Sequence, residues 1–164
     1  MTDPAALDEP AADYEKVMRV HAAAGAVFDA VTTTRGLTAW WARAAGSGGS
    51  GGELQFWMNA PEPLTIRVDR ATRPTSVAWT VLDCPFLPEW VGTRPRFTIV
   101  PFGAGECELQ FRHRGLTARL DCIEMCTRGW DHFLTSLRSH VEAGRGSPVG
   151  SEGDRARRAA ERAG

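Results

Sequence analysis

Hydrophobic and polar positions near the start of the folded region follow two different periods. Residues Glu15–His21 alternate between the two kinds, which predicts a β-strand. Over Ala23–Thr32 the apolar residues recur at helical spacing, which predicts a helix. Either Thr33 or Thr34 can cap a second short helix that ends at the pair Trp40-Trp41. The pattern therefore predicts a strand followed by two short helices.

After the glycine and serine run Gly46–Gly52 the period changes to two, which is typical of strands with one buried face. The run lacks the lysine that closes a phosphate-binding loop, so we expect a flexible connection. The apolar positions are Leu54, Phe56, Met58, Ile66, Val68, Val77, Trp79, Val81, Phe97, Ile99, Cys107, Leu109 and Phe111, and His113 lies on the same face as the last three. Polar residues occupy the alternate positions, among them Gln55, Arg67, Asp69, Glu108, Gln110, Arg112 and Arg114. This alternation, with turns at prolines and glycines, predicts an antiparallel meander with one solvated face.

A long helix is predicted between Arg119 and Glu142. Gly129 lies inside it, where glycine costs about 1 kcal/mol relative to alanine. A close approach of helix and sheet, or space for a ligand, would explain that glycine. The apolar stripe of the helix consists of Cys122, Ile123, Cys126, Trp130, Phe133, Leu134, Leu137 and Val141.

The ends of the chain differ in composition from the middle. Residues 1–12 are mostly proline, alanine and acidic residues, and 144–164 are rich in glycine, serine and arginine. Neither segment offers enough apolar groups to offset the entropy of ordering, so we expect a flexible N-terminal arm and a flexible C-terminal tail with a frayed helix over Asp154–Ala163. The 164 residues suit one domain, which we place at 13–143.

Charge and cysteine content exclude several classes of protein. The formal net charge of −1 and the absence of a basic stripe interleaved with aromatics argue against nucleic acid as a partner. The chain has no apolar run of transmembrane length and an acidic rather than basic start, so we expect a cytoplasmic protein with no membrane partner. Its four cysteines show no disulfide spacing and are interpreted as buried thiols. The preference for arginine over lysine, with much alanine, glycine and proline, indicates a bacterial source.

The order of elements resembles the helix-grip fold of the SRPBCC superfamily, which includes START domains and birch-pollen allergens. Val27-Phe28-Asp29-Ala30-Val31-Thr32, followed by Leu37 and Trp40-Trp41, is similar to the opening of its activator-of-heat-shock-protein-ATPase homologue group. Glu89-Trp90-Val91-Gly92-Thr93, Leu109–Gly115 and Gly129-Trp130 match further signatures of that group. The resemblance covers about Tyr14 to Ala143. It implies an α+β fold in which a curved antiparallel sheet wraps around a long C-terminal helix, with two short N-terminal helices.

The resemblance also implies a cavity between the long helix and the sheet, commonly for hydrophobic or amphipathic small molecules. The alternation of the strands and the helix stripe then supply its candidate lining residues, although an apolar residue on a buried face belongs to a filled core by default. These candidates are Trp41, Phe56, Met58, Trp79, Phe97, Phe111, His113, Cys126, Trp130 and Phe133.

Candidate chemistry is sparse. His113 shares a face with Phe111, has no partner evident from the sequence, and is interpreted as a neutral residue of the core or cavity rather than a catalytic group. Cys122, Cys126 and His140 are too far apart along one helix to close a metal site by themselves. We therefore expect no metal, no cofactor and no catalytic residue.

Three functions stay open at this point. A non-catalytic domain that binds a hydrophobic small molecule is favoured, because no acid, base and nucleophile set is evident. An enzyme similar to polyketide cyclases and aromatases would need His113 or an acid such as Asp83 inside the cavity. A co-chaperone acting on a heat-shock ATPase is the least favoured. A homodimer is also plausible, through an exposed sheet edge or the apolar loop Phe86-Leu87-Pro88.

Overall fold

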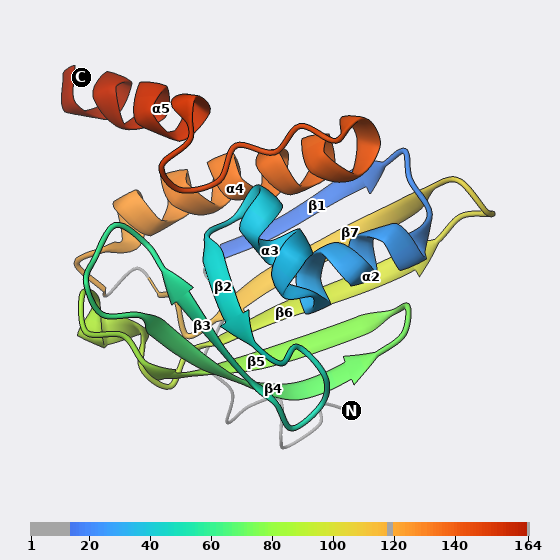
Figure 1. Ribbon diagram of the computed structural model, residues 1–164, viewed down its shortest axis with the longest axis horizontal. Helices are drawn as coiled ribbons and strands as arrows, with labels where there is room; N and C mark the ends of the chain where they lie inside the picture. Colours follow the sequence, from blue (N-terminus) through green and yellow to red (C-terminus); the bar gives the residue numbers. More distant parts are fainter. Residues whose placement is uncertain (1–13, 118–119, 164) are drawn as a thin grey trace, which may run out of the picture.

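The computed structural model describes residues 14–117 and 120–163, and Figure 1 shows the arrangement of its elements. The predicted N-terminal arm lies outside the described residues. The elements in chain order are β1 (Tyr14–Val20), α2 (Ala24–Thr32), α3 (Thr34–Trp40), β2 (Arg43–Gly46), β3 (Glu53–Trp57), β4 (Leu64–Thr72), β5 (Ser76–Asp83), the 3-10 turn η1 (Pro88–Trp90), β6 (Arg94–Pro101), β7 (Cys107–Arg114), α4 (Ile123–Ala143) and α5 (Glu152–Ala163). The predicted helix-grip fold is confirmed.

The described strands form a seven-stranded antiparallel sheet in the order β1-β7-β6-β5-β4-β3-β2. From β2 to β7 each strand lies beside its neighbour in sequence, as a meander requires. β1 joins the far edge by pairing with β7, with Tyr14 opposite His113 and Val20 opposite Cys107. The first strand of the chain thus lies beside the last one.

The long helix α4 lies across one face of this sheet, with α2 and α3 on the same side (Figure 1). Its buried residues include Trp130, Leu134 and Leu137, which are the centre of the predicted apolar stripe. The hydroxyl of Tyr14 on β1 donates a 2.7 Å hydrogen bond to Asp131 of α4. Burial and this neighbouring carboxylate raise the pKa of Tyr14, so the phenol remains a donor at neutral pH.

The loop between β2 and β3 is more tightly bonded than its glycine and serine composition suggested. The hydroxyl of Ser50 accepts a 2.8 Å hydrogen bond from the amide of Ala71, and the amide of Gly51 donates to Val68 at 2.8 Å. A Cβ on Gly48 would lie 1.9 Å from the carbonyl oxygen of Thr32. The glycines therefore permit close packing against β4 and the end of α2, rather than serving only as a flexible connection.

The segment after α4 turns back along that helix and leads to α5, which lies beside the N-terminal half of α4 (Figure 1). The amide of Val149 donates to the carbonyl of Trp41 at 2.7 Å, and the amide of Ser147 donates to the hydroxyl of Ser136 at 2.6 Å. Asp154, in the first turn of α5, is fully buried. These contacts were not anticipated for residues 144–164, whose flexibility stays a prediction together with the domain boundary at 143.

Candidate functional site

The space between the centre of α4 and the sheet is filled by aromatic side chains. Trp41 stacks on Trp79 at 5.8 Å between ring centroids and lies 5.3 Å from Trp130. Phe111 lies 4.4 Å from Trp130 and 5.0 Å from Phe97. These separations are those of packed aromatic pairs, so no ligand fits among these rings.

A pocket of about 420 Å³ opens at one end of this aromatic core, between α4, η1 and α5. We call it the α4–α5 pocket. Its apolar lining consists of Trp41, Met58, Leu87, Trp90, Met125, Cys126, Gly129, Trp130 and Phe133. Its charged lining consists of Arg128, Arg157, Arg158, Glu161 and Arg162. The combination of an aromatic floor and a charged rim suits a molecule that is apolar at one end.

The ten candidate residues divide between this pocket and the core. Five of them line the pocket, namely Trp41, Met58, Cys126, Trp130 and Phe133. The other five are fully buried in the core, namely Phe56, Trp79, Phe97, Phe111 and His113. Alternation identified the buried face of each strand, but it could not show which part of that face is covered by other side chains.

His113 is the centre of a buried chain of hydrogen bonds. The indole N–H of Trp130 donates to Nδ1 of His113 at 2.9 Å, and Nε2 of His113 lies 2.9 Å from the hydroxyl of Thr93. Because an indole nitrogen can only donate, Nδ1 is the unprotonated nitrogen and Nε2 carries the hydrogen. The hydroxyl of Thr93 donates in turn to the carbonyl of Trp90 at 2.6 Å. Both ring nitrogens of His113 are thus occupied by protein groups.

Burial lowers the pKa of His113 to about 3, because the charged imidazolium would lose its hydration. The ring is therefore neutral at physiological pH, as the sequence analysis expected. Trp90 lies edge-on to His113 at 4.7 Å and stacks parallel to Trp130 at 6.1 Å. His113 consequently fixes two tryptophans of the pocket floor without lining the pocket itself.

Gly129 lines the α4–α5 pocket, and a Cβ placed on it would meet no atom within 4 Å. A close approach of helix and sheet therefore does not explain this glycine. The missing side chain instead leaves open space above the pocket floor. Of the two explanations that the sequence offered, the second agrees with this geometry.

The rim contributed by α5 had no counterpart in the sequence-based candidates. Asp154 accepts hydrogen bonds from the amide of Gly150 at 3.0 Å and from Arg157 at 2.8 Å, and forms an ion pair with Arg158 at 3.3 Å. Burial alone would raise the pKa of Asp154, but these hydrogen bonds and charges outweigh it and lower the pKa. In the sequence, this helix is indicated by Arg157 and Arg158, which have the acidic residues Asp154 and Glu161 three or four positions away.

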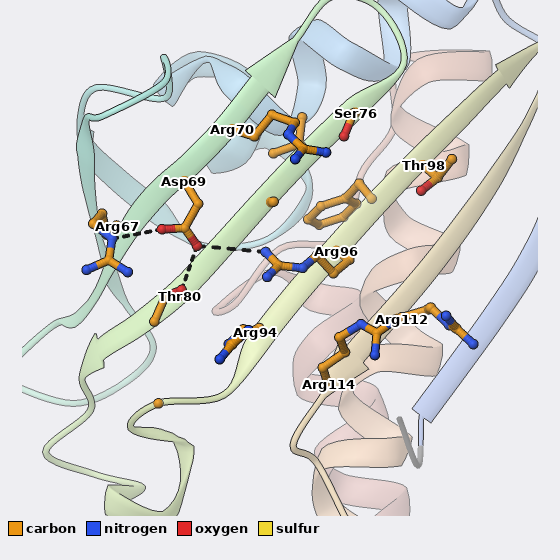
Figure 2. A pocket seen from close by; sticks show the side chains of 14 residues that line it. Arg67, Asp69, Arg70, Ser76, Thr80, Arg94, Arg96, Thr98, Arg112 and Arg114 are labelled. Carbon is orange, nitrogen blue, oxygen red and sulfur yellow. Dashed lines mark hydrogen bonds and ion pairs between the residues drawn. The ribbon is translucent and has the colours of Figure 1, made fainter. Parts of the chain in front are cut away.

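A second hollow, of about 850 Å³, lies on the opposite face of the sheet from α4 and is shown in Figure 2. We call it the arginine groove, because Arg67, Arg70, Arg94, Arg96, Arg112 and Arg114 line it. Asp69 at its centre accepts from Arg67 at 2.8 Å and lies 3.8 Å from Arg96. The groove is open and mostly polar, so it offers little apolar surface to a hydrophobic ligand. The alternation predicted a solvated face here, but not this gathering of arginines.

One buried cysteine, Cys126, lines the pocket, but it is a poor nucleophile. The indole N–H of Trp90 lies 3.2 Å from the sulfur of Cys126. Burial raises the pKa of the Cys126 thiol and raises that of Cys84 to about 11. Within residues 14–117 and 120–163, no three histidine, cysteine, aspartate or glutamate side chains cluster in a way that would hold a metal ion.

Comparison with known families places this geometry in context. The family described as Activator of Hsp90 ATPase homolog 1-like protein matches residues 21–142. The chain belongs to this family. The match spans the region from α2 to α4, which includes the floor of the pocket and excludes α5. No curated protein matches the chain closely enough in sequence to be compared.

Solved structures similar to this family member show the same fold. The Aha1 dimer from Colwellia psychrerythraea is 24% identical, with a TM-score of 0.69 over 80% of this chain and 97% of that one. CalU16 from Micromonospora echinospora is 18% identical, with a TM-score of 0.65 over 91% of this chain and 85% of its own. DynU16, from the dynemicin biosynthetic locus, is 20% identical with a TM-score of 0.63, and the match covers 47% of its length. At these identities the likeness establishes the SRPBCC fold alone.

Proposed function

We propose that this chain binds a small hydrophobic or amphipathic molecule in the α4–α5 pocket without catalysing a reaction. The observation that supports this proposal is the pocket itself, whose volume of about 420 Å³ is lined by three tryptophans and Phe133. Ligand sites for small molecules commonly measure about 300–1,000 Å³ and combine an apolar lining with a few polar groups. Gly129 supports the proposal further, because it leaves the space open at a cost in helix stability.

The chemistry of the lining favours binding over catalysis. His113 does not line the pocket, and both of its nitrogens are engaged by Trp130 and Thr93. The pocket carboxylate, Glu161, is paired with Arg157 at 3.0 Å and Arg128 at 3.5 Å. A general base needs a free lone pair within reach of the substrate proton. The lone pair of His113 is taken by Trp130, and the carboxylate of Glu161 is engaged by two guanidinium groups.

A cyclase-like enzyme using the same pocket is the alternative. The support for this alternative is the similar fold of DynU16, a putative protein in the dynemicin biosynthetic locus. The family name similarly keeps a co-chaperone role, and with it a stress response, as the least favoured candidate. None of the helices in the described parts of the chain is long and apolar enough to cross a membrane. The cytoplasmic location, the bacterial source and the absence of nucleic acid among the partners stay predictions.

A fluorescence titration with N-phenyl-1-naphthylamine, a neutral aromatic probe, tests the binding proposal. We expect saturable binding that is displaced by a hydrophobic competitor, and we expect Gly129→Leu to abolish it by filling the pocket. Thr135→Leu, on the exposed side of α4, is the matched control and should bind as the unaltered protein does. Absence of binding to the unaltered protein, or unchanged binding in Gly129→Leu, would overturn the proposal.

A further inference from the structure

We infer that the α4–α5 pocket selects an anionic amphiphile, whose apolar body rests on the tryptophan floor and whose negatively charged head group is bound by Arg162 and Arg128. This inference rests on the proposed function, because it names the class of ligand for the same pocket. It is carried by the composition of the rim, where four arginines and a single carboxylate line the opening.

The position of α5 over the pocket is well defined by its contacts. The fully buried Asp154 holds Arg157 and Arg158, and the preceding segment is bonded to α4 and to Trp41. The guanidinium of Arg157 also lies 5.4 Å from the ring centroid of Phe133, over the pocket floor. Arg157 and Arg158 are therefore held beside the aromatic lining rather than extended into solvent.

The rim has more positive charge than its carboxylates balance. Asp154 forms ion pairs with Arg157 and Arg158. Glu161 forms ion pairs with Arg157 and Arg128. Glu124 adds only a distant contact to Arg128 at 4.0 Å. Arg162 lines the pocket with no hydrogen bond or ion pair to any described residue. It is the lining residue most available to a ligand.

A buried donor on the same rim has no acceptor. The Nε of Arg157 is inaccessible to solvent and makes no hydrogen bond within the described residues. Leaving such a donor without a partner costs about 1–3 kcal/mol, but because protein atoms cover it, a ligand in the pocket does not reach it in this arrangement. The excess positive charge of the rim is therefore the observation that indicates an anion there. Carboxylate, sulfonate and phosphate head groups share the required chemistry.

A matched pair of probes separates this inference from the proposal of binding. 8-Anilinonaphthalene-1-sulfonate has the aromatic body of N-phenyl-1-naphthylamine with an added sulfonate, so the two differ mainly in charge. We expect Arg162→Gln to weaken binding of the sulfonate probe about fivefold. This loss lies between that expected for removing an exposed ion pair and that expected for removing a buried hydrogen bond to a charged group. Binding of the neutral probe should change by less than about twofold, because R162Q leaves the tryptophan floor intact. Arg128→Gln combined with R162Q should weaken sulfonate binding further.

Arg155→Gln is the control, because Arg155 is exposed on the same helix and does not line the pocket. This variant should bind both probes as the unaltered protein does. Higher ionic strength should weaken binding of the sulfonate probe only. Equal effects of R162Q and R155Q, or equal loss of both probes in R162Q, would overturn the inference while leaving the binding proposal standing. Failure of the neutral probe to bind the unaltered protein would overturn both.

Discussion

The indole nitrogen of Trp130 on α4 donates a 2.9 Å hydrogen bond to Nδ1 of His113 on β7. This bond joins the long helix to the strand beside the β1 edge of the sheet, and it satisfies two polar groups that would otherwise be buried without partners. It also orients the face of Trp130 that lines the α4–α5 pocket. A residue that sequence reasoning weighed as an acid or base is therefore placed as a support for the pocket floor.

Acid should destabilise the protein through His113. The folded-state pKa of His113, about 3, lies below its ordinary value of 6.5, so the unfolded chain takes up the proton first. The contribution of His113 to stability is then complete above about pH 6.5 and is lost as the pH falls toward 3, at about 1.4 kcal/mol per pH unit. Chemical denaturation at several pH values measures this slope. His113→Gln should have a shallower slope over this window, and an identical slope would contradict the assignment.

The hydroxyl of Thr93 should stabilise the folded protein through its hydrogen bond with His113. Replacing it by valine removes the acceptor for Nε2 of His113 and leaves a buried N–H without a partner. We expect Thr93→Val to lower the free energy of unfolding by about 1–3 kcal/mol. Thr93→Ser keeps the hydroxyl and should recover most of that loss, as measured by thermal or urea unfolding. Equal losses in the two variants would indicate that the methyl group, and not the hydrogen bond, is responsible.

Alanine at position 129 should stabilise the protein and impair binding. A Cβ at Gly129 meets open space, so Gly129→Ala gains about 1 kcal/mol of helix propensity without a clash. The same methyl group occupies the pocket and should weaken binding of N-phenyl-1-naphthylamine. Calorimetric unfolding and the probe titration measure the two effects separately. A loss of stability would show that the helix is closer to its neighbours here than the structure indicates.

The attachment of α5 should depend on the carboxylate of Asp154. Because its pKa is lowered in the folded protein, its contribution is present above the unfolded value of about 3.9 and is lost as the pH falls through the folded value. We expect Asp154→Asn to accelerate hydrogen exchange of the α5 amides at neutral pH while exchange in β4 to β7 stays slow. Glu152→Gln, at an exposed position of the same turn, is the control. Unchanged exchange in Asp154→Asn would show that the backbone contacts of residues 147–149 suffice.

Self-association is expected at micromolar concentration. The sheet leaves β1 and β2 as its two edges, and Val17 on β1 is 61% exposed. Phe86 and Leu87, which the sequence suggested as a contact, are partly buried against the core, so the edge strands are the better candidates. Sedimentation velocity should give the mass of a dimer, and a monomer at all concentrations would exclude it.

Local pattern determined most of the architecture. The period of two in β3 to β7, the helical stripe of α4 and the cap at Thr33 each follow from neighbours in sequence. These signals are local because a strand or helix buries one face whatever it packs against. The short strand β2 was missed, since Arg43–Gly46 is mostly alanine and glycine and shows no alternation. Its strand pairing is supplied by β3.

Only the tertiary structure decided which buried residues line a pocket and which fill the core. Phe111 and Trp130 have the same apolar character in sequence, yet only Trp130 reaches the pocket, because neighbouring rings cover Phe111. The partners of His113 lie 17 and 20 residues away, so no local signal could reveal them. The flexibility of residues 144–164 was predicted from composition. Composition does not show that Asp154 is buried and forms ion pairs with two arginines. Periodicity determines which face of a strand or helix a residue occupies, whereas contacts between distant segments decide which side chains pack against that residue.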